Sequence, residues 1–244
     1  MRSALVTGAS RGIGRGIAFR LAERGYALTI TSRKPADLAA LAPELRAAGA
    51  PHVVHYAADM ADRAALAEVV DAHQAAFTNM NALVLSAGVG TAGPIDTLPL
   101  HRFDRTVEVN LAAAFVLIQH SLPLLRAAAA ADPDRGAKVI ALASITGVHP
   151  EPGLAAYGAT KAALISLMQT LNAEESNRGV TATAIAPGYV HTDMSAWVTD
   201  TIPPHTMIPV ADVVAVADML LSLGPRTSIT TIVMSRSGTT GHHA

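Results

Sequence analysis

The sequence has no cysteine, few aromatic residues and almost no net charge. The absence of cysteine from 244 residues excludes a disulfide framework, a thiolate zinc site and a cysteine nucleophile. The 18 basic and 19 acidic side chains leave a formal net charge of -1, which provides no field to attract nucleic acid or an anionic membrane. We therefore expect a protein of the reducing cytoplasm, without nucleic-acid or membrane partners.

Long apolar runs and metal-binding clusters are also missing from the pattern. The charge-free stretch 110–125 contains Asn, Gln, His and Pro and is shorter than the roughly 20 apolar residues of a membrane span. His52 and His55 lie close together in the sequence, but a three-residue offset in a strand points their side chains to opposite faces. We predict neither a membrane span nor a metal site.

What the sequence does contain is a regular alternation of short apolar runs with longer amphipathic stretches, which is typical of α/β proteins. Strands are expected at Ser3–Thr7, Ala27–Thr31, His52–Ala57, Ala82–Ser86, Lys138–Ala143, Thr181–Ala186 and Thr230–Met234. Helices are expected at Gly14–Arg24, Ala36–Ala48, Arg63–Phe77, His101–Leu125, Leu154–Glu175 and Ala211–Leu223. The runs are apolar on both faces, as in strands covered by helices on each side. This pattern predicts a Rossmann-like, doubly wound parallel sheet of about seven strands, formed by residues 1–244 as one domain.

A glycine-rich loop follows the first expected strand. The segment Thr7-Gly8-Ala9-Ser10-Arg11-Gly12-Ile13-Gly14 opens the first helix, with three residues between its first two glycines. Glycines permit a tight turn and close approach to a pyrophosphate, whose charge is met by free N–H groups at the helix start. In this context we interpret the loop as a dinucleotide site, although an ordinary strand-to-helix turn is the alternative.

A second pattern combines a serine, a tyrosine and a lysine. Tyr157 and Lys161 share one face of an expected helix, and Ser144 closes the strand thirteen residues before Tyr157. A phenol has an unperturbed pKa of about 10, so it works as an acid or base near neutral pH only beside a cation. Lys161 supplies that charge, and Ser144 can hold a carbonyl oxygen against the phenol. A surface tyrosine and lysine paired across one helix turn is the alternative reading.

With these motifs the whole chain resembles the classical short-chain dehydrogenase/reductase family, whose fingerprint is T-G-x-x-x-G-x-G with a downstream serine and Y-x-x-x-K. The resemblance implies hydride transfer between a nicotinamide cofactor and a carbonyl or secondary alcohol. It assigns catalysis to Asn110, Ser144, Tyr157 and Lys161. In this family the asparagine kinks its helix and holds a water in the proton relay to the lysine, which also holds the nicotinamide ribose.

The resemblance also indicates which cofactor is bound. In the family an acidic residue after the second strand selects NAD, whereas Thr31-Ser32-Arg33-Lys34 has no carboxylate there. Arg33, Arg11 and the Ser32 hydroxyl can bind a 2′-phosphate, so NADP(H) is favoured over NAD(H). Three further motifs of the family are matched. Asp59-Met60 would contact the edge of the adenine, Pro187-Gly188 would shape the backbone beside the nicotinamide, and Thr192 would bind the carboxamide. Together the expected cofactor-binding residues are Gly8, Ser10, Arg11, Gly12, Ile13, Gly14, Ser32, Arg33, Asp59, Met60, Ser86, Ala87, Gly88, Tyr157, Lys161, Pro187, Gly188, Val190 and Thr192.

Two segments depart from the family pattern. Leu85-Ser86-Ala87-Gly88 stands where Asn-Asn-Ala-Gly is common, and Ser86 cannot be both amide donor and acceptor. Hydrogen bonding between the central strands is therefore in question. Near the end, Met234-Ser235-Arg236-Ser237-Gly238 replaces a frequent Asp-Gly-Gly in a segment that joins subunits in many relatives. A homo-oligomer, either tetramer or dimer, is still implied by the resemblance.

The substrate is much less defined than the chemistry. Residues 193–208 correspond to the family's variable lid, and the expected substrate-binding residues are Ser144, His149, Leu154, Tyr157, Tyr189 and Trp197. Arg178 matches a basic position that 3-oxoacyl carrier-protein reductases present to acyl carrier protein. The leading hypothesis is an NADPH-dependent reductase of a small carbonyl compound. The alternatives are an NAD-linked alcohol oxidation, a 3-oxoacyl thioester reductase and a non-catalytic nucleotide-binding subunit.

Overall fold

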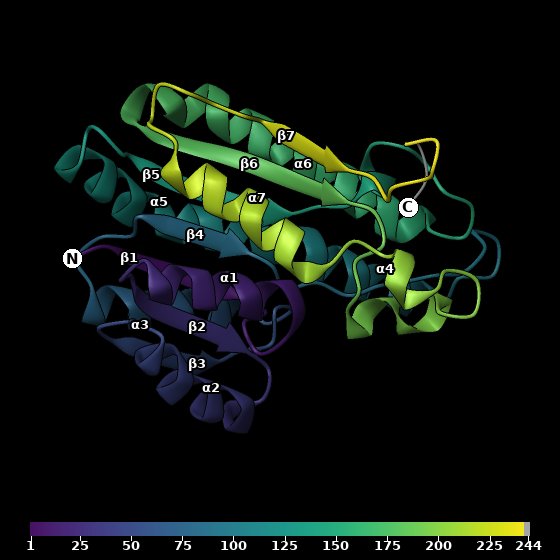
Figure 1. Cartoon of the computed structure of the whole chain (residues 1–244), viewed down its shortest axis with the longest axis horizontal. Coiled ribbons are helices and arrows are strands. Elements are labelled where there is room, and N and C mark those ends of the chain that lie inside the picture. Colours follow the sequence, from purple (N-terminus) through teal and green to yellow (C-terminus); the bar gives the residue numbers. More distant parts are fainter. Residues whose placement is uncertain (242–244) are drawn as a thin grey trace.

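The computed structural model describes residues 1–241 and contains one parallel sheet (Figure 1). Within these residues the sheet has seven strands in the order β3-β2-β1-β4-β5-β6-β7. Their bounds are β1 Ser3–Thr7, β2 Ala27–Ser32, β3 Val53–Ala57, β4 Ala82–Leu85, β5 Ala137–Leu142, β6 Val180–Pro187 and β7 Thr231–Met234. The predicted fold class is confirmed, and residues 242–244 of the predicted domain lie outside the described part.

Helices cover both faces of the sheet because each strand projects apolar side chains alternately to one face and the other. In β1, Leu5 packs on one face with α3 (Arg63–Ala76), α5 (Ala113–Ala131) and α6 (Ala155–Glu175). Ala4 and Val6 point to the opposite face, which is covered by α1 (Gly12–Glu23), α2 (Pro35–Ala47) and α7 (Val210–Ser222). The two hydrophobic cores so formed fix the sheet as the middle layer of three.

The predicted helix His101–Leu125 lies within one continuous helical run, but this run ends later than predicted and contains a π-helical turn. The chain forms α4 (Leu100–Val107), a π-helical turn (Glu108–Ala112) and then α5, which continues to Ala131. A π turn inserts one extra residue, which redirects the helix and is a common device at functional sites. Here the turn buries Val109 and Asn110.

The combined helical run Leu100–Ala131 is long and apolar enough to span a membrane by length and composition alone. Its inward face, however, belongs to the core of this sheet. Leu117 and Leu125 are almost completely buried there among side chains of α3, β4 and β5. Packing against the sheet therefore accounts for the apolar residues on this inward face.

The serine at the end of β4 is accommodated by a threonine of β1. The Thr7 hydroxyl oxygen accepts hydrogen bonds from the backbone N–H groups of Ser86 and Ala87, both at 3.0 Å, and donates to the Val84 carbonyl at 3.3 Å. The parallel register between β1 and β4 is kept. The central strands are thus joined across their ends by a hydroxyl of β1, without the amide that the family pattern supplies.

Candidate functional site

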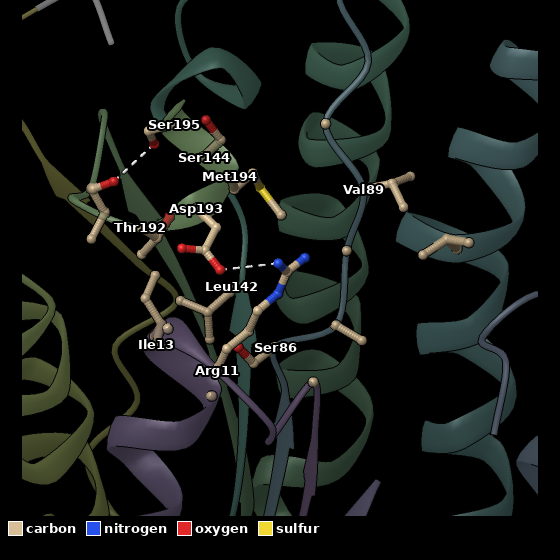
Figure 2. Close-up of a pocket in the computed structure, with 18 of the residues that line it drawn as sticks. Arg11, Ile13, Ser86, Val89, Leu142, Ser144, Thr192, Asp193, Met194 and Ser195 are labelled. Atoms are coloured by element: carbon tan, nitrogen blue, oxygen red, sulfur yellow. Dashed lines mark hydrogen bonds and ion pairs between the residues drawn. The ribbon is translucent and has the colours of Figure 1, made fainter. Parts of the chain in front are cut away.

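A cleft of about 1050 Å³ runs along the carboxyl ends of the strands, where ligands bind in open parallel sheets. It is lined by every residue that the sequence assigned to the cofactor, from Gly8 to Thr192 in sequence order. Ser144, Leu154, Tyr157, Tyr189 and Trp197 also line it. The topology therefore brings the predicted cofactor residues and five of the six predicted substrate residues into one cleft, part of which is drawn in Figure 2.

The glycine loop gives this cleft an exposed backbone. Helix α1 begins at Gly12, and Arg11 at its N-cap makes no side-chain capping bond to the first turn. A Cβ on Gly14 would collide with the Gly8 carbonyl oxygen, and a Cβ on Gly8 would lie 2.9 Å from backbone atoms of Ala87. The loop is therefore packed tightly against the strand ends, while the uncapped N–H groups of the first turn fit a phosphate.

The end of the cleft beside β2 carries a polar atom without a partner. Ser32 Oγ is buried and has no hydrogen-bond partner among the residues that the structure describes. Arg33 and Lys34 are exposed beside it, and all three line the cleft. A buried hydroxyl that lacks a protein partner next to two cations fits a bound anion.

Arg11 of the glycine loop also lines the cleft, and its side chain contacts an acidic residue. Its guanidinium forms an ion pair at 3.1 Å with Asp193, which begins the 193–208 segment (Figure 2). Both side chains are largely exposed, so this pair contributes little to stability on its own. It does, however, connect the glycine loop to the 193–208 segment across the cleft. Thr192, which precedes Asp193, lies against Gly12, with its Cγ2 3.4 Å from the position that a Cβ on Gly12 would take.

Sequence reasoning missed an arginine beside Asp59, one of the expected cofactor-binding residues. Arg105 of α4 contacts both carboxylate oxygens of Asp59, at 2.8 and 2.9 Å. This interaction, together with a bond from the Ala61 N–H, holds the pKa of Asp59 below its usual range. Nothing local could have revealed the pair, because 46 positions separate its members and only the fold places α4 beside the end of β3.

Ser144, Tyr157 and Lys161 converge at the other part of the cleft. The Lys161 amino nitrogen lies 5.5 Å from the centre of the Tyr157 ring and donates a hydrogen bond of 2.7 Å to the Leu142 carbonyl. The Ser144 side chain interacts with the Tyr157 hydroxyl. Ser144 and Lys161 are each more than nine-tenths buried. A phenol, a cation and a serine hydroxyl are therefore held together at the wall of the cleft, with the cation and the serine shielded from bulk water.

Burial sets the proton affinities of this group. It raises the pKa of Tyr157 to about 12, an effect that the Ser144 hydrogen bond opposes. It lowers the pKa of Lys161 to about 8. In the chain without ligands the phenol is therefore protonated at neutral pH and able to donate, and the lysine is mostly charged. Any step that removes the phenol proton depends on that neighbouring positive charge.

Asn110 lies behind this group and does not line the cleft. Its side chain accepts from the Val89 N–H at 2.9 Å and donates to the Val89 carbonyl at 3.1 Å and to Thr160 Oγ1 at 3.3 Å. A Cβ placed on Gly88 would be 3.3 Å from Asn110 Oδ1 and 3.6 Å from Lys161 Nζ. The amide and the lysine amine thus both border Gly88, and Thr160 connects Asn110 to the helix that carries Tyr157.

Two glycines that the sequence reading passed over set the approach of Ser144 to Tyr157. A Cβ on Gly147 would lie 2.7 Å from backbone atoms of α6, and a Cβ on Gly158 would lie 2.9 Å from the Thr146 carbonyl oxygen. The absence of both side chains lets the turn after β5 rest directly on α6. Their positions, just beyond Ser144 and Tyr157, are the signal that could have found them.

The open side of the cleft is aromatic and partly charged. Tyr189 and Trp197 make an edge-to-face contact with ring centres 6.2 Å apart, and Trp197 remains 59% exposed. The Tyr189 hydroxyl donates to Glu151 at 3.3 Å. Burial and then the Glu151 carboxylate raise the pKa of Tyr189 to about 12. His149, expected at this wall, is not among the residues that line the cleft.

Arg178 lies far from these groups in the fold. It lies two residues before the start of β6. It is therefore near the amino ends of the strands, on the side of the sheet opposite the cleft. Its guanidinium pairs at 3.1 Å with Glu175, which Arg126 also binds. Within residues 1–241 no group of three or more metal-ligating side chains is present.

Comparison with known proteins identifies the family to which the chain belongs. The model of the short chain dehydrogenase family matches residues 2–202. The chain belongs to this family. A similar relative is the 3-oxoacyl-[acyl-carrier-protein] reductase FabG of Staphylococcus aureus, with 34% identity over 216 residues, 86% of this chain and 84% of the relative. The FabG of Staphylococcus epidermidis is 35% identical over 82% of this chain and 79% of its own length.

Solved structures of short-chain dehydrogenases agree with this assignment. A short chain dehydrogenase from Burkholderia cenocepacia in complex with NADP is 30% identical, has a TM-score of 0.85, and covers 97% of this chain and 96% of its own. The Pseudomonas aeruginosa RhlG/NADP complex is 27% identical with a TM-score of 0.87, over 98% of this chain and 96% of the other. As a short-chain dehydrogenase, this protein is an oxidoreductase that uses a nicotinamide cofactor.

Proposed function

We propose that this short-chain dehydrogenase transfers a hydride between NADP(H) and a carbonyl compound or its secondary alcohol. The observation that carries the proposal is the convergence of Ser144, Tyr157 and Lys161 in one cleft, where the serine and the lysine are buried. The other end of the same cleft offers an uncapped helix start and the unpartnered Ser32 hydroxyl. One cleft therefore combines proton-transfer groups with a site suited to a phosphorylated dinucleotide.

Each member of the catalytic set has a distinct role in this proposal. When bound, the nicotinamide supplies the hydride in reduction and accepts it in oxidation. Tyr157 donates its phenolic proton to the substrate oxygen, Ser144 donates a hydrogen bond to the same oxygen, and Lys161 stabilises the resulting phenolate. Asn110 supports the relay of a proton to Lys161 from outside the cleft lining, because both side chains lie next to Gly88.

The preference for NADP(H) rests on charge at the end of β2. Arg33 and Lys34 are exposed at the cleft, and no carboxylate ends the strand to bind ribose hydroxyls. The Ser32 hydroxyl has an unused donor for a phosphate oxygen. Two of the similar structures are described as NADP complexes. An NAD-linked reaction is the rival that these groups disfavour.

The open side of the cleft receives the substrate in this proposal. Leu154, Tyr189 and Trp197 form its walls, and residues 193–208 act as the lid that excludes water. We place the enzyme in the cytoplasm as a dimer or tetramer, in keeping with the absence of cysteine and with the family resemblance.

Replacing the phenol tests the proposed chemistry directly. Tyr157→Phe removes the proton donor and keeps the ring, so we expect kcat for NADPH-dependent reduction of a ketone panel to fall by about 100-fold or more. Cofactor binding, measured by quenching of protein fluorescence, is expected to persist. Turnover near the wild-type rate in this variant, with NADPH bound, would refute the role of the hydroxyl.

A 3-oxoacyl thioester is the second candidate substrate, favoured by the 34% identity to the staphylococcal FabG. Acyl carrier protein would then be a partner, with Arg178 as the basic contact that the resemblance suggests. Comparing turnover of a 3-oxoacyl carrier-protein thioester with that of a small ketone separates these substrates. Absence of turnover with both would leave the non-catalytic nucleotide-binding subunit as the better description.

A further inference from the structure

The hydroxyl of Ser144 has a close neighbour that the catalytic set does not include. Thr146 Oγ1 donates a hydrogen bond of 2.9 Å to Ser144 Oγ, and the Thr146 backbone N–H points to the same oxygen at 3.3 Å. Both side chains are buried, with 7% of Ser144 and 5% of Thr146 exposed. Thr146 thus provides two donors to Ser144 Oγ from within the same turn.

These two bonds determine which way the Ser144 hydroxyl hydrogen can point. A hydroxyl has one hydrogen and two acceptor lone pairs. Thr146 occupies the acceptor positions of Ser144 Oγ with two donated bonds, so the single hydrogen of Ser144 is directed to its other side. That side carries the Tyr157 hydroxyl and the open cleft.

The turn that carries Thr146 is held firmly enough to fix this direction. The Thr146 carbonyl packs against Gly158 of α6, and Gly147 packs against the backbone of Lys161 and Ala162. Neither contact leaves space for a side chain at the glycine, so the turn cannot move toward α6. The donors of Thr146 are therefore anchored to the helix that carries Tyr157 and Lys161.

We propose that Thr146 is a positioning residue that keeps Ser144 in the orientation of a hydrogen-bond donor toward the substrate oxygen. This inference rests on the proposed carbonyl chemistry, in which that oxygen gains negative charge as hydride arrives. A donor that is already oriented needs no reorganisation at that moment, whereas a freely rotating hydroxyl does. Thr146 lines the same cleft as Ser144, and the role proposed here acts through its hydrogen bonds to Ser144.

The test removes the donor hydroxyl while the shape of the side chain is retained. Thr146→Val is nearly isosteric and keeps the backbone N–H, whereas Thr146→Ser restores a hydroxyl. We expect kcat to fall by about tenfold in Thr146→Val, with the KM for NADPH unchanged, and to recover to within about threefold of wild type in Thr146→Ser. Thr146→Ala removes the same hydroxyl and replaces Thr146→Val if the latter does not fold.

Thr183→Val is the matched control because it makes the same chemical change at a buried threonine outside the cleft. Thr183 is 6% exposed, and its hydroxyl donates to the Ile229 carbonyl at 2.6 Å. This variant should lose thermal stability and keep its kinetic constants. A decrease in kcat of similar size in Thr183→Val would show a general packing effect and would overturn the positioning role.

The pH profile of alcohol oxidation gives a second readout. Ser144 lowers the pKa of Tyr157 by its hydrogen bond, so loss of its fixed orientation should move the rising limb of kcat/KM to higher pH in Thr146→Val. If Ser144→Ala is inactive but Thr146→Val has wild-type kcat and profile, the inference fails while the proposed function stands. A wild-type chain without turnover overturns both.

Discussion

Individual buried groups show how one residue type can serve different purposes in this fold. Lys138 and Lys161 are both more than nine-tenths buried, and burial lowers the pKa of each. Lys138 donates hydrogen bonds to Thr181 Oγ1 at 3.0 Å and to the Gly224 carbonyl at 3.3 Å. Its ammonium group therefore holds neighbouring segments together. Lys161 instead lies beside the Tyr157 ring. The neighbour, and not the burial, distinguishes the lysine suited to catalysis.

Replacing Lys161 should therefore separate stability from activity. Its pKa of about 8, compared with 10.5 in the unfolded chain, corresponds to roughly 3 kcal/mol of unfavourable desolvation at neutral pH. Lys161→Met removes that cost and loses a hydrogen bond to Leu142 worth about 1 kcal/mol, so we expect a net gain of about 1–2 kcal/mol. Thermal unfolding at pH 7 should show a Tm higher by about 2–4 °C per kcal/mol, with turnover abolished.

The pH dependence of this gain has a defined sign. Between pH 8 and 10.5 the unfolded wild type binds more protons at residue 161 than the folded protein, so wild-type stability rises with pH there. The advantage of Lys161→Met should thus shrink at pH 9.5. Lys138→Met is the control and should keep its turnover. A lower Tm for Lys161→Met at pH 7 would contradict the assigned desolvation cost.

At the level of whole elements, small polar contacts decide how helices attach to the sheet. Helix α3 carries His73, which is completely buried against β1 and β2. Its Nε2 lies 3.0 Å from the Asn79 carbonyl and its Nδ1 lies 2.8 Å from Thr29 Oγ1. Since a carbonyl can only accept, Nε2 carries the proton and Nδ1 accepts from Thr29. This pattern belongs to the neutral imidazole, which is the form that burial favours.

Acid should weaken this attachment. Burial lowers the pKa of His73 from 6.5 to about 4, so between these values the unfolded chain binds more protons and stability falls as the pH decreases. The full effect is at most about 3 kcal/mol. Urea unfolding at pH 7, 6 and 5 measures it. His73→Asn should be less stable at pH 7 but should show a smaller loss toward pH 5.

A matched substitution at an exposed histidine controls for the general effect of acid. His101 lies on the surface of α4, so His101→Asn should keep the wild-type pH dependence. If His73→Asn loses stability with acid as steeply as wild type, the buried imidazole is not the source of the acid sensitivity.

At the scale of the molecule, the cleft joins strand ends that are distant in the sequence. Its lining extends from Gly8 after β1 to Trp197 after β6, with β2, β4 and β5 between them in the chain. A ligand that binds only this folded arrangement stabilises the whole cooperative unit according to its concentration and affinity. Thermal unfolding therefore reports the affinity of the cleft for each cofactor.

Arg33→Ala should reveal the cofactor preference in such a measurement. We expect NADPH to raise the wild-type Tm more than NADH does at equal concentration, because Arg33 can bind the 2′-phosphate. In Arg33→Ala the NADPH shift should decrease to about the NADH shift, which should itself change little. Arg46→Ala, at an exposed arginine of α2 outside the cleft, is the control. Equal losses for both cofactors would rule out the phosphate contact.

The amino-acid sequence alone determined those features that depend on near neighbours in the chain. Apolar periodicity predicted the three layers, and the glycine loop and the i, i+4 relation of Tyr157 and Lys161 are local patterns that need no partner from elsewhere. They sufficed to predict the fold, and the family resemblance that they carry supplied the cofactor residues, which all line the cleft, and Asn110 and His149, which do not.

Only the tertiary structure decided contacts between distant segments. It paired Asp59 with Arg105 and Arg11 with Asp193, and it packed the turn that contains Thr146 against Gly158 of α6. It also introduced a π turn at Asn110 into the long helix, so that the amide reaches Val89 and Thr160. Local propensity carries no information about such pairs, because their energy arises only after packing has brought separate elements within hydrogen-bond distance.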